Sequence, residues 1–182
     1  PTGDVLMLFK SLATALQLGG WSLLVPQDAA EEALRPGAYV VDGGHSTALF
    51  RVTHLGVGAF WGRFNVVEGQ ITHDPEDVEA SSVRITIPVG SVDSNSAQRD
   101  EHLKSPDFFD VENLPEASFE STAIEAAEGG YTVTGNLTLH GVTKSISFPA
   151  QIEIAPDRVT AQAEFFVKRF DFEIVYPGKP DD

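Results

Sequence analysis

The feature that most constrains the fold of this chain is an alternation of apolar and polar residues over two neighbouring stretches. In TALFRVTH, Phe50, Val52 and His54 point to one face of an extended chain and the residues between them point to the other. In AFWGRF, Phe60 and Phe64 alternate with more polar neighbours in the same way. The Gly-containing connection between the two stretches favours an antiparallel pair of strands, each with one apolar face.

The same period of two recurs along most of the remaining chain. The patterned stretches are residues 83–89, 119–123, 131–139, 146–154 and 159–167. Gly-, Pro- and Asp-containing turns separate them, and connections this short imply an antiparallel meander, without crossover helices. The sequence therefore predicts an all-β domain, either a closed barrel or a sandwich.

The inward face of these strands combines large apolar side chains with small ones. Small residues among large ones fit the taper of a packed barrel, and periodicity alone favours that reading. They would equally leave a tunnel for a thin apolar ligand, since about eight strands enclose room for one small ligand. The predicted inward set is Phe50, Val52, His54, Phe60, Phe64, Phe119, Leu137, Leu139, Phe148 and Phe165, with Gly62, Gly135, Ala161 and Ala163 among them.

One long stretch without strand pattern, residues 94–114, interrupts the series. Asn95 and Ser96 are N-cap candidates for a short helix, and the PDFF that follows is typical of a further turn. The charged residues from Arg99 to Lys104 are expected to pair with one another on an exposed helix face. An insertion of this length inside a β-domain predicts a lid over one end of the barrel.

The N-terminal part of the chain has a different composition. Residues 5–25 are mostly apolar, with Lys10 as their only charge. As an α-helix this stretch would span about 30 Å, the thickness of a bilayer core. We therefore expect residues 1–36 to hold an apolar helix, either a membrane anchor or an uncleaved signal segment, followed by an acidic linker. A buried or amphipathic soluble helix is the alternative.

Charge and composition exclude several classes of partner. The formal net charge is −15, from 27 acidic and 12 basic side chains, so phosphate backbones would be repelled and no nucleic-acid partner is expected. Without cysteine there is no thiolate metal site, disulfide or Cys nucleophile. The five histidines lack the spacing of a metal site, and no G-x-S-x-G elbow is present. We therefore expect no metal, no catalytic residues and no enzyme activity.

Several sequence words, taken together and in order, resemble the YceI-like family. They are YVVDGGHS, FRVTH, VGSVDSNSAQRDEHLKSPDFFD, YTVTGNLTLHGVTKSISFP and FFVKRFDFEI. The resemblance covers residues 38–176 and implies an extended, lipocalin-like antiparallel barrel whose lumen holds a polyisoprenoid lipid or isoprenoid quinone. It also implies an exported protein, periplasmic or otherwise extracytoplasmic. On this reading the lumen is a ligand tunnel, and no catalytic cofactor is involved.

Two further expectations concern the residues that contact the ligand's head group and the last strand of the barrel. His45 and His54 are the candidates for contacting a head group at the tunnel mouth. The chain stops at Asp182, where relatives continue into a last strand, so the barrel domain of residues 37–182 is expected to lack its closing strand and expose an edge.

Two functions from different classes therefore stand. The first is non-catalytic binding of an isoprenoid lipid for transport or storage. The second is a structural or accessory subunit of a larger membrane complex, held to membrane protein partners through residues 5–25, with the barrel as a platform outside the membrane.

Overall fold

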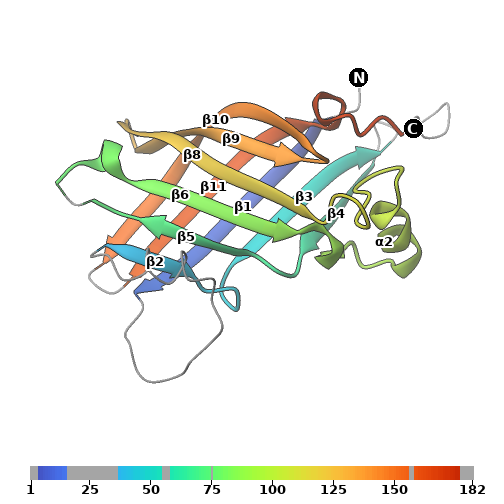
Figure 1. Ribbon diagram of the computed structural model, residues 1–182, viewed down its shortest axis with the longest axis horizontal. Helices are drawn as coiled ribbons and strands as arrows, with labels where there is room; N and C mark the ends of the chain where they lie inside the picture. Colours follow the sequence, from blue (N-terminus) through green and yellow to red (C-terminus); the bar gives the residue numbers. More distant parts are fainter. Residues whose placement is uncertain (1–3, 16–36, 55–57, 75, 156–157, 177–182) are drawn as a thin grey trace.

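The computed structural model describes residues 4–15, 37–54, 58–74, 76–155 and 158–176, which form one antiparallel sheet of eleven strands (Figure 1). Its strands are β1 (Asp4–Ala15), β2 (Ala38–Val41), β3 (Thr47–His54), β4 (Gly58–Phe64), β5 (Glu68–Thr72), β6 (Ser82–Pro88), β7 (Val92–Asp93), β8 (Glu116–Ala127), β9 (Gly130–Leu139), β10 (Val142–Ala155) and β11 (Arg158–Lys168). The all-β prediction is confirmed, and the sheet is a lipocalin-like barrel.

Three long strands of this barrel are each interrupted once, at neighbouring points. β2 and β3 both pair with β1. On their other edges, β2 pairs with β5 and β3 pairs with β4. In turn, β5 pairs with β6 and β4 pairs with β7. The interruptions touch: the Asn65 N–H donates to the Ser91 carbonyl at 3.0 Å, and the Val66 N–H donates to Ser91 Oγ at 3.2 Å. We call this line of interruptions, at residues 42–46, 65–67 and 89–91, the crease; the barrel wall changes direction there.

The ring of strands is closed by the N-terminal strand. β1 pairs with β11 from Asp4↔Lys168 to Thr14↔Arg158, and its other edge pairs with β3 and then β2. In Figure 1, β6, β8, β9 and β10 cross in front of β11, β1 and β3, and the space between the two layers is the interior. Both edges of β11 are thus occupied, one by β10 and the other by β1.

This arrangement corrects the expectation for the N-terminus. Residues 5–15 were expected in an apolar helix outside the barrel, but they form a strand of its wall. The edge that a missing last strand would expose is paired with this segment. The rest of the expected helix and the acidic linker, residues 16–36, lie outside the described residues. Among the helices that are described, none has the length and apolar character needed to cross a membrane.

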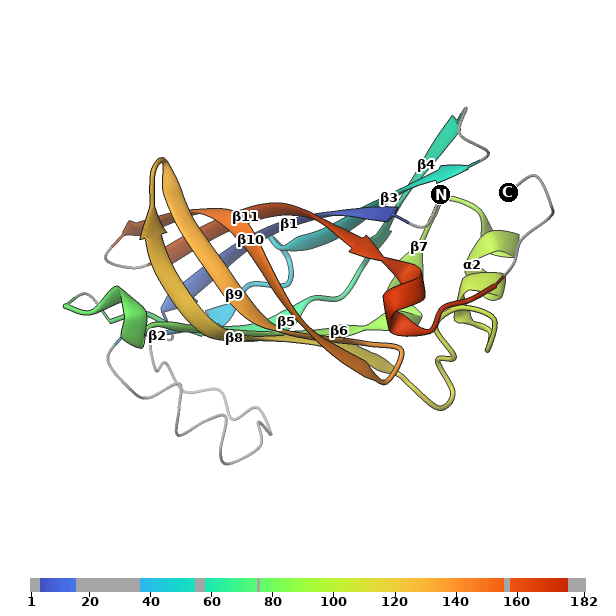
Figure 2. The ribbon, with the colours of Figure 1, turned by 90° about the horizontal axis from the view of Figure 1, so that it is seen from above.

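The predicted lid is present at one end of the barrel. Helix α2 (Ala97–Lys104) begins at Ser96, whose side chain accepts a hydrogen bond from the Arg99 N–H, as the N-cap prediction required. The PDFF segment forms hydrogen-bonded turns, with the Phe109 N–H donating to the Leu103 carbonyl at 3.0 Å. Figure 2 shows α2 at the same end as the 3-10 turn η3 (Arg169–Phe172), which follows β11.

Two buried glycines make room for aromatic rings in the wall. Gly62 lies opposite Phe50 in the β3–β4 register, and a Cβ there would collide with the Phe50 ring. Gly135 likewise sits beneath the ring of Phe119. Neither glycine has a positive φ, so the requirement is space and not backbone conformation: space for the ring at Gly62, and for the ring and the Glu120 carbonyl at Gly135. Small residues thus serve here to seat large ones, as in aromatic cover of strand glycines.

Replacing Gly62 with alanine should therefore destabilise the protein although alanine suits a strand at least as well. We expect Gly62→Ala to lower the free energy of unfolding by about 1–3 kcal/mol, the usual cost of overpacking. Gly58→Ala, on the same strand with nothing within 4 Å of the added Cβ, is the matched control and should change stability by less than about 0.5 kcal/mol. Urea unfolding measures both; equal effects would contradict the packing argument.

A second prediction tests whether β1 closes the barrel in solution. Phe9 is partly buried against the core and Lys10, its neighbour, is exposed. Phe9→Ser should lower the free energy of unfolding by about 2 kcal/mol or more, whereas Lys10→Ser should have little effect. Indistinguishable urea midpoints for the two variants would show that this segment does not occupy the wall.

Candidate functional site: the barrel lumen

Three cavities follow one another along the barrel interior. The first, of about 540 Å³, lies under the lid; the second, of about 110 Å³, lies in the middle; and the third, of about 30 Å³, lies at the far end. Met7, Phe64 and Leu139 line both the first and the second, and four residues are shared by the second and third. The three cavities therefore adjoin one another along the interior, here called the lumen, and the widest lies beside the lid.

The lumen wall is almost entirely apolar in its middle part. Among the described residues, Ser118 and Gln162 are the only ones with polar side chains in the lining there. Phe148 stacks on Phe165 with ring centroids 4.4 Å apart, and Phe119 lies 5.3 Å from Phe148 in a tilted arrangement. These three aromatic rings would contact a thin hydrocarbon chain over much of its length.

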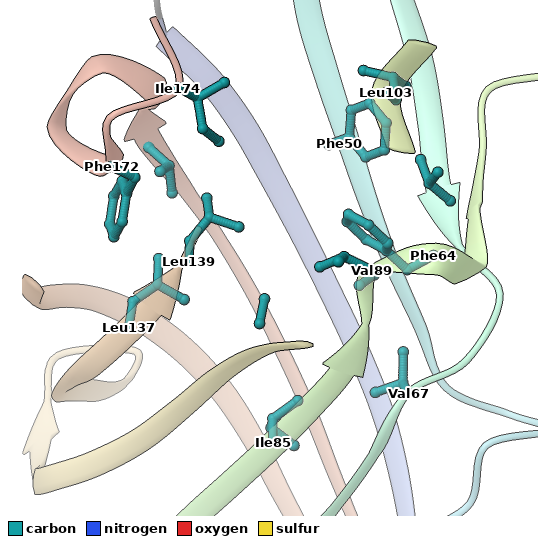
Figure 3. Packing of buried hydrophobic residues seen from close by; sticks show 14 of the residues in the cluster. Phe50, Phe64, Val67, Ile85, Val89, Leu103, Leu137, Leu139, Phe172 and Ile174 are labelled. Carbon is teal, nitrogen blue, oxygen red and sulfur yellow. The ribbon is translucent and has the colours of Figure 1, made fainter. Parts of the chain in front are cut away.

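Near the crease, aromatic side chains join the barrel wall to the lid. Phe64 contacts Phe50 and the lid residue Phe109, with ring centroids 5.5 Å and 5.6 Å apart. Figure 3 shows Phe50 and Phe64 on one side of the interior and Leu137 and Leu139 on the other. Because Phe64 and Leu139 line both cavities, they bound the passage from the wide part to the narrow part.

Apart from His54, the lumen residues predicted from the sequence all line the cavities. Phe50, Val52 and Phe60 line the wide cavity, Phe64 and Leu139 line the wide and middle cavities, and the remaining apolar candidates line the middle one, namely Phe119, Leu137, Phe148 and Phe165. That these side chains contact a ligand stays a prediction. The side chain of His54 lies outside the described part of the chain.

His45, the other head-group candidate, lies away from the lumen. Its side chain is 71% exposed, and its Nδ1 lies 2.8 Å from Asp42 Oδ2 in the turn between β2 and β3. This hydrogen bond holds the pKa of the Asp42 carboxyl below its ordinary value. His45 belongs to the DGGHS turn at the crease, so the expectation that it lies at the tunnel mouth is wrong.

The polar residues of the mouth come from the lid and from the turn after β11. Arg99 and His102 on α2 line the wide cavity together with Arg169 and Tyr176. The prediction that Arg99 lies on an exposed, self-paired helix face is wrong. Arg99, His102 and Leu103 are spaced i, i+3, i+4, so one helix face carries all three toward the lumen. The expected pairing does hold for Glu101 and Lys104, at 3.5 Å.

Arg99 is fixed by Ser94 and by an aromatic ring. Its Nε donates to Ser94 Oγ at 2.7 Å, one Nη donates to the Ser94 carbonyl at 2.6 Å, and its guanidinium lies 4.5 Å from the centroid of Phe60. Ser94 is 3% exposed and binds Asp100 Oδ1 through both its N–H and its hydroxyl. Ser94 therefore links the start of the lid to the lumen mouth.

The aromatic residues of the lid pack against the end of the chain. His102, Phe108 and Tyr176 have ring centroids 4.9–5.0 Å apart, and His102 Nε2 lies 3.0 Å from Asp107 Oδ2. Across the described residues, no group of three or more His, Asp or Glu side chains could hold a metal ion. The lid end thus combines aromatic rings and cationic groups around a wide apolar cavity.

A closed antiparallel barrel with an apolar lumen and a lidded mouth belongs to the lipocalin-like class. Comparison with known proteins identifies the family: residues 39–181 match the YceI-like domain, and the chain belongs to that family. A UPF0312 protein of Pseudomonas aeruginosa (strain LESB58) is 42% identical over 148 residues, which cover 80% of this chain and 74% of the relative. The resemblance inferred from the sequence words is thereby confirmed.

Solved structures agree with this assignment. The crystal structure of the Campylobacter jejuni YCEI protein is 29% identical, has a TM-score of 0.60, and is matched over 67% of this chain and 75% of that chain. A polyisoprenoid binding domain from Saccharophagus degradans has a TM-score of 0.53 over 96% of this chain and 82% of that chain. At 15% identity, this second likeness shows the fold alone.

Removing the Ser94 hydroxyl should loosen the lid. In Ser94→Ala, Arg99 Nε loses its acceptor and Asp100 loses one of two donors, so we expect the free energy of unfolding to fall by about 1–3 kcal/mol. Ser82→Ala, at an exposed position of β6, is the control and should be nearly neutral. Chemical denaturation checks stability, and faster amide exchange confined to 94–109 would locate the effect; unchanged exchange in that segment would contradict it.

Proposed function

We propose that the barrel binds a polyisoprenoid lipid or isoprenoid quinone in its lumen, without catalysis, and serves as a carrier or store. The single observation that carries this proposal is the apolar lumen, wide beneath the lid and narrow beyond Phe64 and Leu139. The family assignment and the fold shared with a polyisoprenoid binding domain support it.

The energetics of such binding follow from the lining. Removing hydrocarbon from water gains about 0.8 kcal/mol per buried methylene, so an apolar tail needs few polar contacts to bind. A preformed cavity also avoids much of the ordering cost that a flexible site would meet on binding. The wide part, at about 540 Å³, is within the size range of small-molecule sites.

One serine that lines the cavities lies near a histidine ring, but its hydroxyl is held by the local turn. Among the described residues that line the cavities, the Ser–His contact is Ser81 Oγ to His73 Nδ1, at 3.4 Å in the small far cavity. Ser81 Oγ also accepts the Asp74 N–H at 3.0 Å, which holds the hydroxyl in the local turn. This geometry favours binding over hydrolysis.

The alternative of a membrane-anchored subunit is less well supported. It depended on residues 5–25 as a helix available to a membrane or to partner proteins. Residues 5–15 are instead paired along both edges in the barrel wall, so that part of the segment already has partners within the chain.

The experiment is native mass spectrometry with organic extraction of the protein purified from its own source. We expect one isoprenoid or quinone per chain. Leu139→Asp should abolish retention, because a charge in the passage between the cavities is costly to bury. Thr138→Asp, the adjacent residue on β9, is the matched control and should retain the ligand.

A second variant separates loss of ligand from loss of fold. Val52 is only partly buried and lines the wide cavity, so Val52→Trp should fill that space while preserving an apolar wall. We expect a folded protein with little bound lipid. Full occupancy by lipid in folded Leu139→Asp and Val52→Trp would refute binding in the lumen, and so would an empty wild-type protein that binds no added isoprenoid.

A further inference from the structure

The mouth of the lumen carries positive charge although the protein as a whole is strongly acidic. Arg99 and Arg169 line the wide cavity, and its lining among the described residues contains no carboxylate; His102, also in the lining, lies 3.0 Å from Asp107 Oδ2. The net charge of the whole chain is −15. Cationic groups beside an apolar cavity are unexpected in a chain with so many acidic residues, and this indicates that they have a function at the cavity.

Neither arginine is neutralised by a direct ion pair within the described part of the chain. Arg99 donates to the neutral oxygens of Ser94, and Asp100 is linked to it only through that serine. Of the five N–H groups on a guanidinium, two on Arg99 are used in these bonds. The remaining donors belong to a guanidinium that Phe60 holds in place from one side.

Arg169 is held in a similar way from the opposite part of the mouth. One Nη donates to the Ile174 carbonyl at 2.8 Å, and the guanidinium lies 4.2 Å from the centroid of Phe170. Burial lowers the pKa of this guanidinium, yet an arginine keeps its charge at neutral pH. A half-buried cation whose partners are a carbonyl and a ring has electrostatic energy to gain from an anion.

The two arginines stand on separate elements around one opening. Arg99 lies on α2 and Arg169 on η3, the two elements that Figure 2 places together at the lid end. Their side chains line the cavity that leads, past Phe64 and Leu139, into the apolar middle of the lumen. An amphipathic molecule with its tail in that passage would carry its head group to the arginines.

We propose that Arg99 and Arg169 form a head-group site that selects lipids with an anionic head, a phosphate or a carboxylate, over neutral lipids of the same tail. This rests on the proposed function, since it assumes a tail in the lumen. Planar guanidinium groups suit both anions because their paired N–H groups match two oxygens at once. A neutral alcohol or quinone would leave the two charges without a counter-ion.

The test is a competition for the delipidated protein between lipids that differ only in the head. Geranylgeranyl monophosphate is set against geranylgeraniol, and oleate against oleyl alcohol, with bound species counted by native mass spectrometry. Charge-assisted hydrogen bonds predict a preference of about tenfold or more for the anion in at least one pair. The preference should decline as salt is raised.

Substitution of the arginines assigns the preference to this site. Arg99→Gln and Arg169→Gln should each reduce the preference for the anion by several-fold while the affinity for the alcohol stays within twofold. Arg84→Gln is the control, because Arg84 is 57% exposed on β6 and pairs with Glu120 at 2.7 Å. If a variant lost alcohol and anion equally, its arginine would be structural and the proposal would fail for that residue.

The outcomes separate this proposal from the function on which it rests. Equal affinity for anion and alcohol in both pairs would overturn the head-group site and leave lipid binding intact. Failure of the wild-type protein to bind any of the four lipids would overturn the proposed function itself. A preference that survives in the double variant Arg99→Gln/Arg169→Gln would place the anion elsewhere and refute the site.

Discussion

The pairing of β1 with β11 is the interaction on which the rest of the structure depends. Without it, one edge of β11 and one edge each of β2 and β3 would be open, and the apolar faces on either side would meet water. A closed ring lets the inner face be apolar without being collapsed, because the hydrogen-bonded wall fixes the distance across the interior. The lumen is thus a consequence of closure, and closure is supplied by a segment far from β11 in sequence.

Within the closed ring, the crease and the seated aromatic rings determine the shape of the lumen. The interruptions at 42–46, 65–67 and 89–91 turn the wall, so the end beside the lid opens into the wide cavity. The rings of Phe50 and Phe119 lie over Gly62 and Gly135 on the neighbouring strands. The glycines thus leave space in the lumen indirectly, because the large aromatic side chains lie over them.

The sequence predicted those parts of the fold that have a local signature. Period-two alternation located most strands and much of the lumen wall. Phe50, Phe64 and Leu139, for example, line the lumen and alternate with more polar residues along their strands. It could not assign β1, because VLMLF has no polar residue at alternate positions and a short apolar run fits helix or strand equally well. The partner that decides the matter is β11, and that contact is visible only in three dimensions.

The positions of His45 and Arg99 were mispredicted for a related reason. His45 lies near a strand start and is a plausible polar contact by sequence position, but the crease turns it toward Asp42. The charged residues around Arg99 in RDEHLK predict a solvated position, but its helical spacing from Leu103 indicates that it faces inward. Arg99 lies between water and an apolar cavity, so the local dielectric constant falls steeply on the cavity side of its guanidinium. An anionic head group held at the mouth would therefore interact with this charge under less screening than in bulk water.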